Sequence, residues 1–419
     1  MWFQLAGSKA LDIGLMSMFD LDIFRVFSRY CVTMHKFTFR FPSRFQRYFN
    51  GPKKLMFVTN VPKKAFKFRP IWATCGLFSA YFGFLFLTDT EDTPEYYPRY
   101  FSATILRYFP LNGLSKAWGR IAQCYIPEPL RPIVYHSYAK FFQCDLSEVE
   151  NPNLTSYSCL SEFFIRKISA EKRPIHQTAT LVSPVDGKIL HCGVIDPRRP
   201  VLEQIKGVHY SLDEFLGPIV QLNNSNPQKT DSTLYQCVIY LAPGDYHRFH
   251  SPVDWMPTVR RHFPGRLLSV RPNLAGRLPG LYAINERVVY LGEWNHGLMS
   301  FTAVGAFGVG NIRVNIDPTL STNKKQDNPL RYRFTNLVSR TINQEYNPPY
   351  LEAIFTNNNN DNNDNNNSNS VKLNKGDELG HFCLGSTVVL IFEAPKNQLK
   401  WCVTPGQRIK LGEPIIMDC

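Results

Sequence analysis

The sequence predicts an α+β protein in which helices come first and a mainly antiparallel β core follows. Residues 71–88 form an uncharged run, and residues from about 100 to 175 carry apolar side chains at helical spacing. After residue 181 the chain changes to short β-type runs that are broken by glycine and proline. With 419 residues, of which 44% are hydrophobic and 14% aromatic, the chain can bury a sizeable core, which excludes wholesale disorder.

The formal charge of +13 lies mainly at the N-terminus. Residues 1–70 hold 13 of the 47 Lys and Arg and 3 of the 34 acidic residues, a balance of +10, whereas residues 71–419 hold 34 against 31, or +3. Because the body is nearly neutral, we expect no nucleic-acid partner. The acid-free, arginine-rich stretch that ends near residue 67 is typical of an organellar transit peptide, and a basic arm on anionic lipid is the alternative. We expect a transit segment over 1–50 and a basic flank over 51–70.

Residues 71–88 predict a transmembrane helix. The run is 18 residues long and uncharged, at the short end of what spans a bilayer. Basic residues precede it and acidic residues follow it, which indicates a single span with its N-terminus on the positive-inside face. A buried core helix is the alternative that length alone allows.

The body of the protein begins with amphipathic helices. Their pattern covers about 100–150, and a further helix is expected over 160–175, with Pro174 near its end. The clearest predicted strands are 234–241, 287–291, 299–304, 312–316 and 387–392. Residues 357–370 contain ten Asn, two Asp and two Ser, so we expect a disordered surface insert there.

A Gly-Ser pair directly precedes the last of these strands. This order places the hydroxyl of Ser386 at a strand mouth, next to a peptide bond whose Gly385 can adopt strained backbone angles. The geometry suits an attack by Ser386 Oγ on the carbonyl of Gly385. A simple turn serine at a strand start is the alternative.

Two other turns carry the residues that could activate a serine. Asp186 lies in a tight turn within Ser183–Lys188, and His247 and His250 lie on a loop after a strand that ends at Leu241. An Asp, a His and a Ser are the parts of a relay in which His takes the serine proton and Asp orients the imidazole.

Several motifs together resemble the phosphatidylserine decarboxylase family of the mitochondrial and bacterial type. They occur in the family's order, and the resemblance covers roughly residue 100 to the C-terminus. The motifs are SEFFIRKISAEKRPI at 161–175, SPVDGK at 183–188, DYHRFH at 245–250, Pro264-Gly265, Asn285–Val288, Val304–Ala306 and LGST at 384–387.

The resemblance implies a proenzyme that cleaves itself between Gly385 and Ser386. A decarboxylase β chain, 100–385, and a 34-residue α chain, 386–419, would form a heterodimer. Ser386 would become a covalent pyruvoyl cofactor and the site of a Schiff base with the substrate amine. By the same resemblance Asp186, His250 and Ser386 form the self-cleavage triad. His247 would transfer a proton during decarboxylation, with a pKa near the working pH.

The reaction implied is the conversion of phosphatidylserine to phosphatidylethanolamine and CO2 by a pyruvoyl-dependent carboxy-lyase of phospholipid biosynthesis. The substrate would be taken from the membrane. Together with the N-terminal segments, the resemblance predicts a single-pass protein of the mitochondrial inner membrane. Its N-terminus would lie in the matrix and its body in the intermembrane space. A homo-oligomer stays open.

Three other functions compete with this prediction. One is a membrane-anchored serine hydrolase acting on lipid esters through an uncleaved Ser386-His250-Asp186 relay, although no G-x-S-x-G elbow is present. Another is a metal site at Asp245, His247 and His250, although no H-E-x-x-H helix is present and we expect no metal. A third is a binding module, because residues 403–415 have the Gly and Ile spacing of small β-barrels.

Overall fold

The computed structural model describes residues 111–419 except 197, 199, 206–207, 219–231, 277, 309–310, 324–349, 356–370, 384, 397–398 and 419. All of them belong to one compact unit, Phe68–Cys419. The predicted transit segment, basic flank, transmembrane helix and asparagine-rich insert lie outside the described residues. Of the helices in the described ranges, none is long and apolar enough to cross a membrane.

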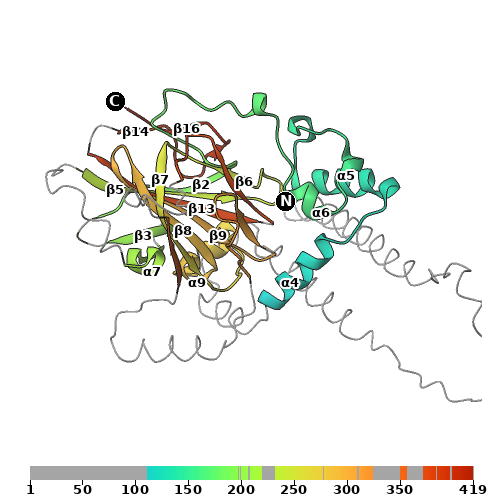
Figure 1. Ribbon diagram of the computed structural model, residues 1–419, viewed down its shortest axis with the longest axis horizontal. Helices are drawn as coiled ribbons and strands as arrows, with labels where there is room; N and C mark the ends of the chain where they lie inside the picture. Colours follow the sequence, from blue (N-terminus) through green and yellow to red (C-terminus); the bar gives the residue numbers. More distant parts are fainter. Residues whose placement is uncertain are drawn as a thin grey trace, which may run out of the picture. The chain divides into compact units, whose positions relative to one another are not determined.

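An eight-stranded sheet forms the core, in the order β11-β7-β8-β9-β13-β5-β2-β15 (Figure 1). Every pair of neighbouring strands in it is antiparallel, so the predicted antiparallel core is confirmed. The central strands are rich in Val, Ile, Leu and Phe and are buried on both faces. The strands are β2 (Gly187–Val194), β5 (Ser232–Leu241), β7 (Trp255–Phe263), β8 (Arg287–Trp294), β9 (Gly297–Gly305), β11 (Leu351–Ile354), β13 (Ser386–Pro395) and β15 (Arg408–Ile409).

Three smaller sheets surround this core, in the orders β10-β12-β6, β1-β16-β14 and β3-β4. Phe249 of β6 packs on Phe301 of β9, with ring centroids 5.4 Å apart, so the β10-β12-β6 sheet covers one face of the large sheet. The strands are β1 (Leu181–Val182), β3 (Val201–Ile205), β4 (Val208–Ser211), β6 (Arg248–His250), β10 (Ile312–Val314), β12 (Glu378–Phe382), β14 (Leu399–Trp401) and β16 (Pro414–Asp418).

A helical segment that contains α4, α5 and α6 comes before the sheets in the chain and lies to one side of them in Figure 1. Tyr135 of α5 stacks on Phe163 of α6, with centroids 4.6 Å apart, and Tyr138 Oη donates to the carbonyl of Pro243 (2.8 Å). These contacts attach the helical segment to the loop after β5. The helices are α4 (Leu111–Ala122), α5 (Arg131–Phe142) and α6 (Leu160–Phe164), followed later by α7 (Leu212–Leu216), α8 (Pro272–Ala275) and α9 (Leu281–Ile284). Single 3-10 turns occur at Glu128–Leu130, Leu146–Glu148, Leu154–Ser156 and Ala170–Lys172.

Most of the predicted elements are confirmed. Helices α4 and α5 lie within 100–150, and β5, β8, β9 and β13 contain the strands predicted at 234–241, 287–291, 299–304 and 387–392. The strand predicted over 312–316 is shorter: β10 ends at Val314, because the chain turns there and Asp317 N donates to Val314 O (3.2 Å).

The helix predicted over 160–175 is wrong for most of its length. Helix α6 ends at Phe164, and Ile168 pairs with Val149 in an antiparallel β-bridge. Lys167 O accepts from Glu150 N (3.0 Å), and Ser169 N donates to Glu148 O (2.9 Å). Backbone groups that a helix would use internally are therefore bonded to the preceding segment, so tertiary pairing overrides the helical pattern.

Candidate active site

Ser386 is the first residue of β13, and it lies between two neighbouring strands. It pairs with Leu241 of β5 and with Gly305 of β9, and its side chain is fully buried. Its Oγ has no hydrogen-bond partner among the described residues. The preceding Gly385 has φ +25°, in the left-handed region that favours glycine. The predicted strand-mouth serine next to a special backbone angle is thus confirmed.

The loop after β5 makes a tight turn against the helical segment. The Asp245 carboxylate accepts a hydrogen bond from Ala242 N (2.7 Å), which closes the turn. At Gly244 a Cβ would lie 2.0 Å from the carbonyl oxygen of Phe142, so only glycine allows this approach. The loop is therefore held both by its own side chain and by the end of α5.

The same loop is attached to the chain at Ser386 and shortly before it. Leu241, the residue just before the loop, is a strand partner of Ser386. At the other end of the loop, the main-chain oxygen of His247 accepts a hydrogen bond from Phe382 N (2.9 Å). Phe382 is the last residue of β12 and precedes Ser386 by only four positions. The pairing of two sheets thus brings the histidine loop and the predicted cleavage site together.

His247 is fully buried, and one of its ring nitrogens is unpaired. Its Nδ1 lies 2.8 Å from the Asp245 carbonyl oxygen, which can only accept, so Nδ1 carries the proton and Nε2 is the bare nitrogen. Nε2 has no partner among the described residues, and the ring packs on Phe164 at 4.1 Å. Burial lowers the pKa of His247 to about 3, not the value near the working pH that we expected. His247 is therefore neutral at pH 7.

His250 does not lie on the loop that we predicted but is the last residue of strand β6, where three further contacts hold it. Its amide donates to Pro184 O (2.9 Å), its Nδ1 lies 2.8 Å from Gly376 O, and its Nε2 lies 3.3 Å from the hydroxyl of Tyr246. The Gly376 carbonyl places the proton on Nδ1, which leaves Nε2 as the acceptor. Burial lowers the pKa of His250, so this imidazole is also neutral and able to accept a proton.

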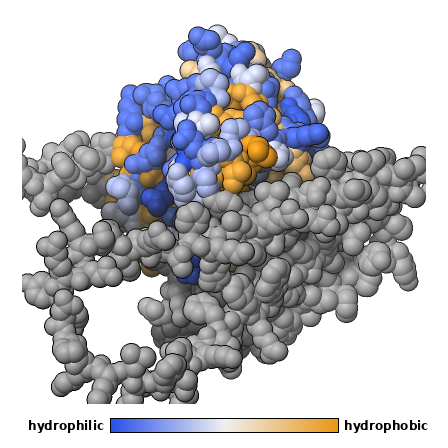
Figure 2. Space-filling view, turned by 90° about the vertical axis from the view of Figure 1, so that its right-hand side faces the viewer, coloured by the Kyte–Doolittle hydropathy of each residue, from blue (hydrophilic) through white to orange (hydrophobic). Residues whose placement is uncertain are grey.

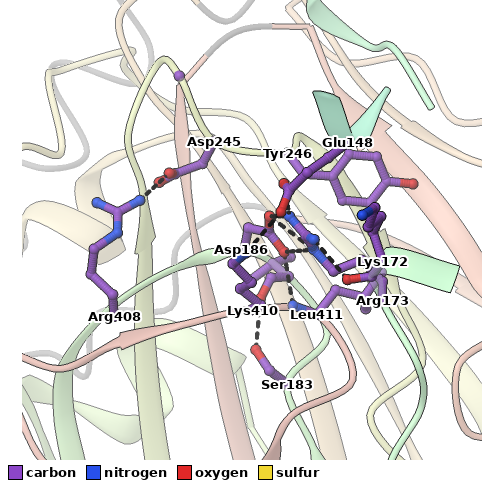
Figure 3. A network of polar contacts seen from close by, with 12 residues as sticks. Glu148, Lys172, Arg173, Ser183, Asp186, Asp245, Tyr246, Arg408, Lys410 and Leu411 are labelled. Atoms are coloured by element: carbon purple, nitrogen blue, oxygen red, sulfur yellow. Dashed lines mark hydrogen bonds and ion pairs between the residues drawn. The ribbon is translucent and has the colours of Figure 1, made fainter. Parts of the chain in front are cut away.

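Asp186 lies in a buried ionic network with Arg173 and Glu148 (Figure 3). Arg173 Nη2 is 2.6 Å from Asp186 Oδ2 and 2.6 Å from Glu148 Oε2. A second donor, Leu411 N, reaches Asp186 Oδ1 at 2.8 Å. Hydrogen bonding from Arg173 lowers the pKa of Glu148 to about 2, so this carboxylate stays charged near neutral pH.

The structure brings Asp186 and His250 together, but it does not join them to Ser386 in a direct relay. The amide of His250 bonds to the Asp186 turn at Pro184, and the negative charge of Asp186 favours protonation of His250. Asp186 hydrogen-bonds to Arg173 and Leu411, however, and His250 Nε2 to Tyr246. Ser386 Oγ bonds to none of them.

Sequence reasoning missed two residues of this region, Tyr246 and Arg173. Tyr246 directly precedes the first histidine of DYHRFH and lies four positions before His250, and its hydroxyl reaches the ring of His250. Arg173 directly precedes Pro174, and only the fold shows that it pairs with Asp186. The available signal was general. Because a buried carboxylate is usually paired, the prediction of Asp186 as a site residue also implies a nearby Lys or Arg.

Asp245, His247 and His250, the residues of the alternative metal site, each contact other groups of the protein. The Asp245 carboxylate bonds to Ala242 N and forms an ion pair with Arg408, and the two histidines bond to separate carbonyl groups. Within the part of the chain that the structure describes, no three His, Cys, Asp or Glu side chains are grouped as metal ligands.

Comparison with known proteins shows the family of the chain. The phosphatidylserine decarboxylase family profile matches residues 160–417. The mitochondrial phosphatidylserine decarboxylase proenzyme of Pongo abelii is 38% identical over 338 residues, which cover 77% of this chain and 76% of the relative. Mitochondrial phosphatidylserine decarboxylase proenzyme 1 of Saccharomyces cerevisiae is 35% identical (73% and 72% covered), and that of Arabidopsis thaliana is 34% identical (77% and 75% covered). The chain therefore belongs to the phosphatidylserine decarboxylase family.

Proposed function

We propose that this chain is a proenzyme that cleaves itself between Gly385 and Ser386 and then converts phosphatidylserine to phosphatidylethanolamine and CO2. The observation that carries the proposal is the buried, unpaired Ser386 Oγ at the start of a central strand, next to a glycine with positive φ. Family membership supports it, because the relatives are named decarboxylase proenzymes.

Self-cleavage requires only groups of this chain and water. The Ser386 oxygen bonds to the Gly385 carbonyl carbon, the Ser386 nitrogen leaves that carbon, and the peptide becomes an ester. A base then takes the α-hydrogen of Ser386, the Gly385 carboxylate is expelled, and water releases ammonia. The pyruvoyl group remains at the new N-terminus of the α chain, 386–419.

His250 is the base that we assign to this cleavage. It is neutral because burial lowers its pKa, and the Gly376 carbonyl holds the proton on Nδ1. The Tyr246 hydroxyl bonds to the accepting Nε2, so it can pass a proton to that nitrogen. The Asp186 charge stabilises the imidazolium that forms, while Arg173 and Leu411 hold the carboxylate in place.

The residues around Ser386 fit a pyruvoyl group. The Oγ position is buried and has no competing hydrogen bond, and pairing with Leu241 and Gly305 fixes the backbone there. The pyruvoyl carbonyl would supply an electron sink for the charge left by decarboxylation. His247 provides a neutral, unpaired Nε2 that can take a proton from the substrate ammonium and return it to the substrate carbon after CO2 has left.

Replacement of single serines and histidines tests the proposal. Ser386→Ala and His250→Ala should each give one full-length chain without decarboxylase activity. Ser300→Ala is the matched control, because Ser300 is also buried with an unpaired hydroxyl but lies in β9, away from the cleavage site. It should be cleaved and active. A wild-type protein that stays uncleaved yet acts on lipid esters would instead support the serine hydrolase, and a cleaved Ser386→Ala protein would contradict the proposed site.

We also propose that the protein is anchored in the mitochondrial inner membrane through residues 71–88, with its body in the intermembrane space. The mitochondrial names of the relatives support the compartment, and the charge asymmetry of the sequence supports the orientation. After import into isolated mitochondria, the body should become protease-sensitive once the outer membrane is ruptured. Protection until the inner membrane is dissolved would contradict this orientation.

The helical segment offers a surface for contact with lipid. It exposes large apolar side chains at Ile121, Tyr125, Ile133 and Phe141. Figure 2 views the side on which α5 lies in Figure 1 and shows hydrophobic groups among hydrophilic ones there. Such a mixed surface suits the membrane interface, where the substrate is found. The segment also contacts the histidine loop, through the bond from Tyr138 to Pro243.

A further inference from the structure

Arg166 is a buried cation that lacks an anionic partner. It follows the end of α6 and is only 3% exposed. Its Nη2 donates to Gly244 O (2.9 Å), but Nε and Nη1 are buried without a hydrogen-bond partner within normal geometry among the described residues. The Cys144 thiol interacts with Arg166, but burial raises the pKa of this thiol, so it supplies no anion. The guanidinium lies over the Phe163 ring at 5.3 Å, which stabilises the charge only partly.

Three other buried arginines contact carboxylates, while Arg131 and Arg287 donate to main-chain carbonyls. Arg173 contacts two carboxylates, Arg260 is 2.8 Å from Asp317, and Arg261 is 2.7 Å from Glu352. No described carboxylate lies within ion-pair distance of Arg166. A buried charge with unpaired donors is costly, so these donors require a functional explanation.

Arg166 lies beside the histidine of the proposed decarboxylation step. It bonds to the loop at Gly244, and Phe164, two residues earlier, packs on the His247 ring at 4.1 Å. Burial is the main cause of the low pKa of His247, and the hydrogen bond to Asp245 O opposes it. The positive charge of Arg166 lowers this pKa further. Unpaired donors and an unpaired acceptor, His247 Nε2, thus occur in one buried region next to Ser386's strand partner Leu241.

We propose that Arg166 binds the phosphodiester group of the phospholipid headgroup. This inference rests on the proposed function. Guanidinium groups match phosphate oxygens well, and hydrogen bonds between charged groups are the strong ones. The substrate also has a carboxylate, but that charge is lost as CO2 leaves. An arginine paired with it would stabilise the substrate more than the transition state, whereas the phosphodiester keeps its charge throughout.

Binding at Arg166 would also affect proton uptake by His247, whose low pKa is caused mainly by burial and in smaller part by the charge of Arg166. A phosphate anion beside the guanidinium offsets the positive charge that opposes protonation of His247. The histidine therefore takes up a proton more readily when the lipid is in place than in the free protein. Arg166 would act both as a binding residue and as an influence on proton transfer.

The test compares phosphatidylserine with the same lipid whose phosphate is capped as a neutral methyl phosphotriester, in identical detergent micelles. The cleaved wild-type enzyme should have a kcat/KM for the capped lipid about 10- to 100-fold lower than for phosphatidylserine. This factor corresponds to the loss of one hydrogen bond between charged groups. Arg166→Gln should lose this factor on the natural lipid and change little on the capped one, while Arg166→Lys should keep part of the preference. Arg131→Gln, which removes a buried arginine bonded to main-chain carbonyls, should keep the full preference.

Equal wild-type rates on the two lipids would overturn the inference. An equal loss on both lipids in Arg166→Gln would also overturn it, since it would indicate a structural role or a contact with the carboxylate. If Arg166→Gln fails to process, the wild-type comparison still decides. A cleaved wild-type protein that decarboxylates neither lipid would instead refute the proposed function.

Discussion

His247 and His250 lie three positions apart, yet their free ring nitrogens have different partners. Nε2 of His250 contacts the Tyr246 hydroxyl, whereas Nε2 of His247 contacts nothing among the described residues. Both rings carry their proton on Nδ1 because a carbonyl oxygen faces it. His247 therefore keeps a ring nitrogen that no described residue occupies, whereas both ring nitrogens of His250 contact the protein. This difference supports separate roles in decarboxylation and in self-cleavage.

The buried His247 should make the protein less stable in acid. The folded state keeps it neutral, with a pKa of about 3, while the unfolded chain takes up a proton near the ordinary value of 6.5. Because the unfolded state binds the extra proton, the free energy of unfolding falls as pH drops from 6.5 toward 3, by at most about 1.4 kcal/mol per pH unit. Above pH 6.5 the contribution is complete and constant.

Urea unfolding of the wild type and His247→Gln measures this effect. Glutamine does not titrate, so the stability advantage of the wild type over the variant should shrink between pH 6.5 and pH 4.5. A difference that stays the same across this range would show that His247 is not held neutral by the fold.

At the scale of elements, Arg173 links a 3-10 turn to the Asp186 turn and to Glu148. It lies at the end of the turn Ala170–Lys172, and both carboxylates that it contacts are largely removed from water. The arrangement ties the segment before the sheet to the start of β2. Because Leu411 N and Lys410 Nζ bond to the same two carboxylates, it also ties both to the C-terminal segment.

Arg173→Ala should lower the free energy of unfolding by about 3–5 kcal/mol, because it removes the cation that the buried Asp186 carboxylate contacts. Arg408→Ala is the control. Arg408 also pairs with an aspartate, Asp245, but its side chain is 67% exposed, so its loss should cost less than about 1 kcal/mol. Comparable losses in both variants would show that the Asp186 network has no special weight.

Elements with strong local signals could be predicted from the sequence. The runs that became β5, β9 and β13 are rich in β-branched and aromatic residues, and Gly385 before Ser386 marks the strand start. Helix α6 was predicted too long because the bridge between Val149 and Ile168 depends on residues outside the helix pattern. The periodicity of apolar residues reports only on contacts between neighbours along the chain.

The candidate site could be predicted only in part, for a related reason. Asp186, His247, His250 and Ser386 belong to short motifs that the sequence displays. Their hydrogen-bond partners are set by the fold. Asp186 accepts from Arg173, and the ring of His250 bonds to Tyr246 and Gly376. The low pKa of His247 likewise follows from burial, which no local pattern records.

At the scale of the whole molecule, the C-terminal segment 386–419 is inserted into the body rather than attached to its surface. Strand β13 lies between β5 and β9 and pairs with both, while β15 pairs with β2 and β16 pairs with β1 (Figure 1). The breakage of one peptide bond before β13 leaves all of these ladders intact. The two chains should therefore stay together after cleavage without a covalent bond between them.

Gel filtration in mild detergent should show the α and β chains eluting together, and a denaturing gel of the same fraction should separate them. Ser386→Ala should give one band under both conditions. Release of the short chain from the wild-type protein without denaturant would contradict the view that β13 is a central strand of the finished enzyme.

The intact mass of the C-terminal fragment from the purified wild-type protein tests the self-cleavage most directly. A fragment of residues 386–419 that is lighter, by one ammonia, than the same peptide beginning with serine is the expected result, because the pyruvoyl group replaces the serine amine and hydroxymethyl. A fragment with an unmodified N-terminal Ser386, a break at another bond, or only an uncleaved chain in an active preparation would contradict it.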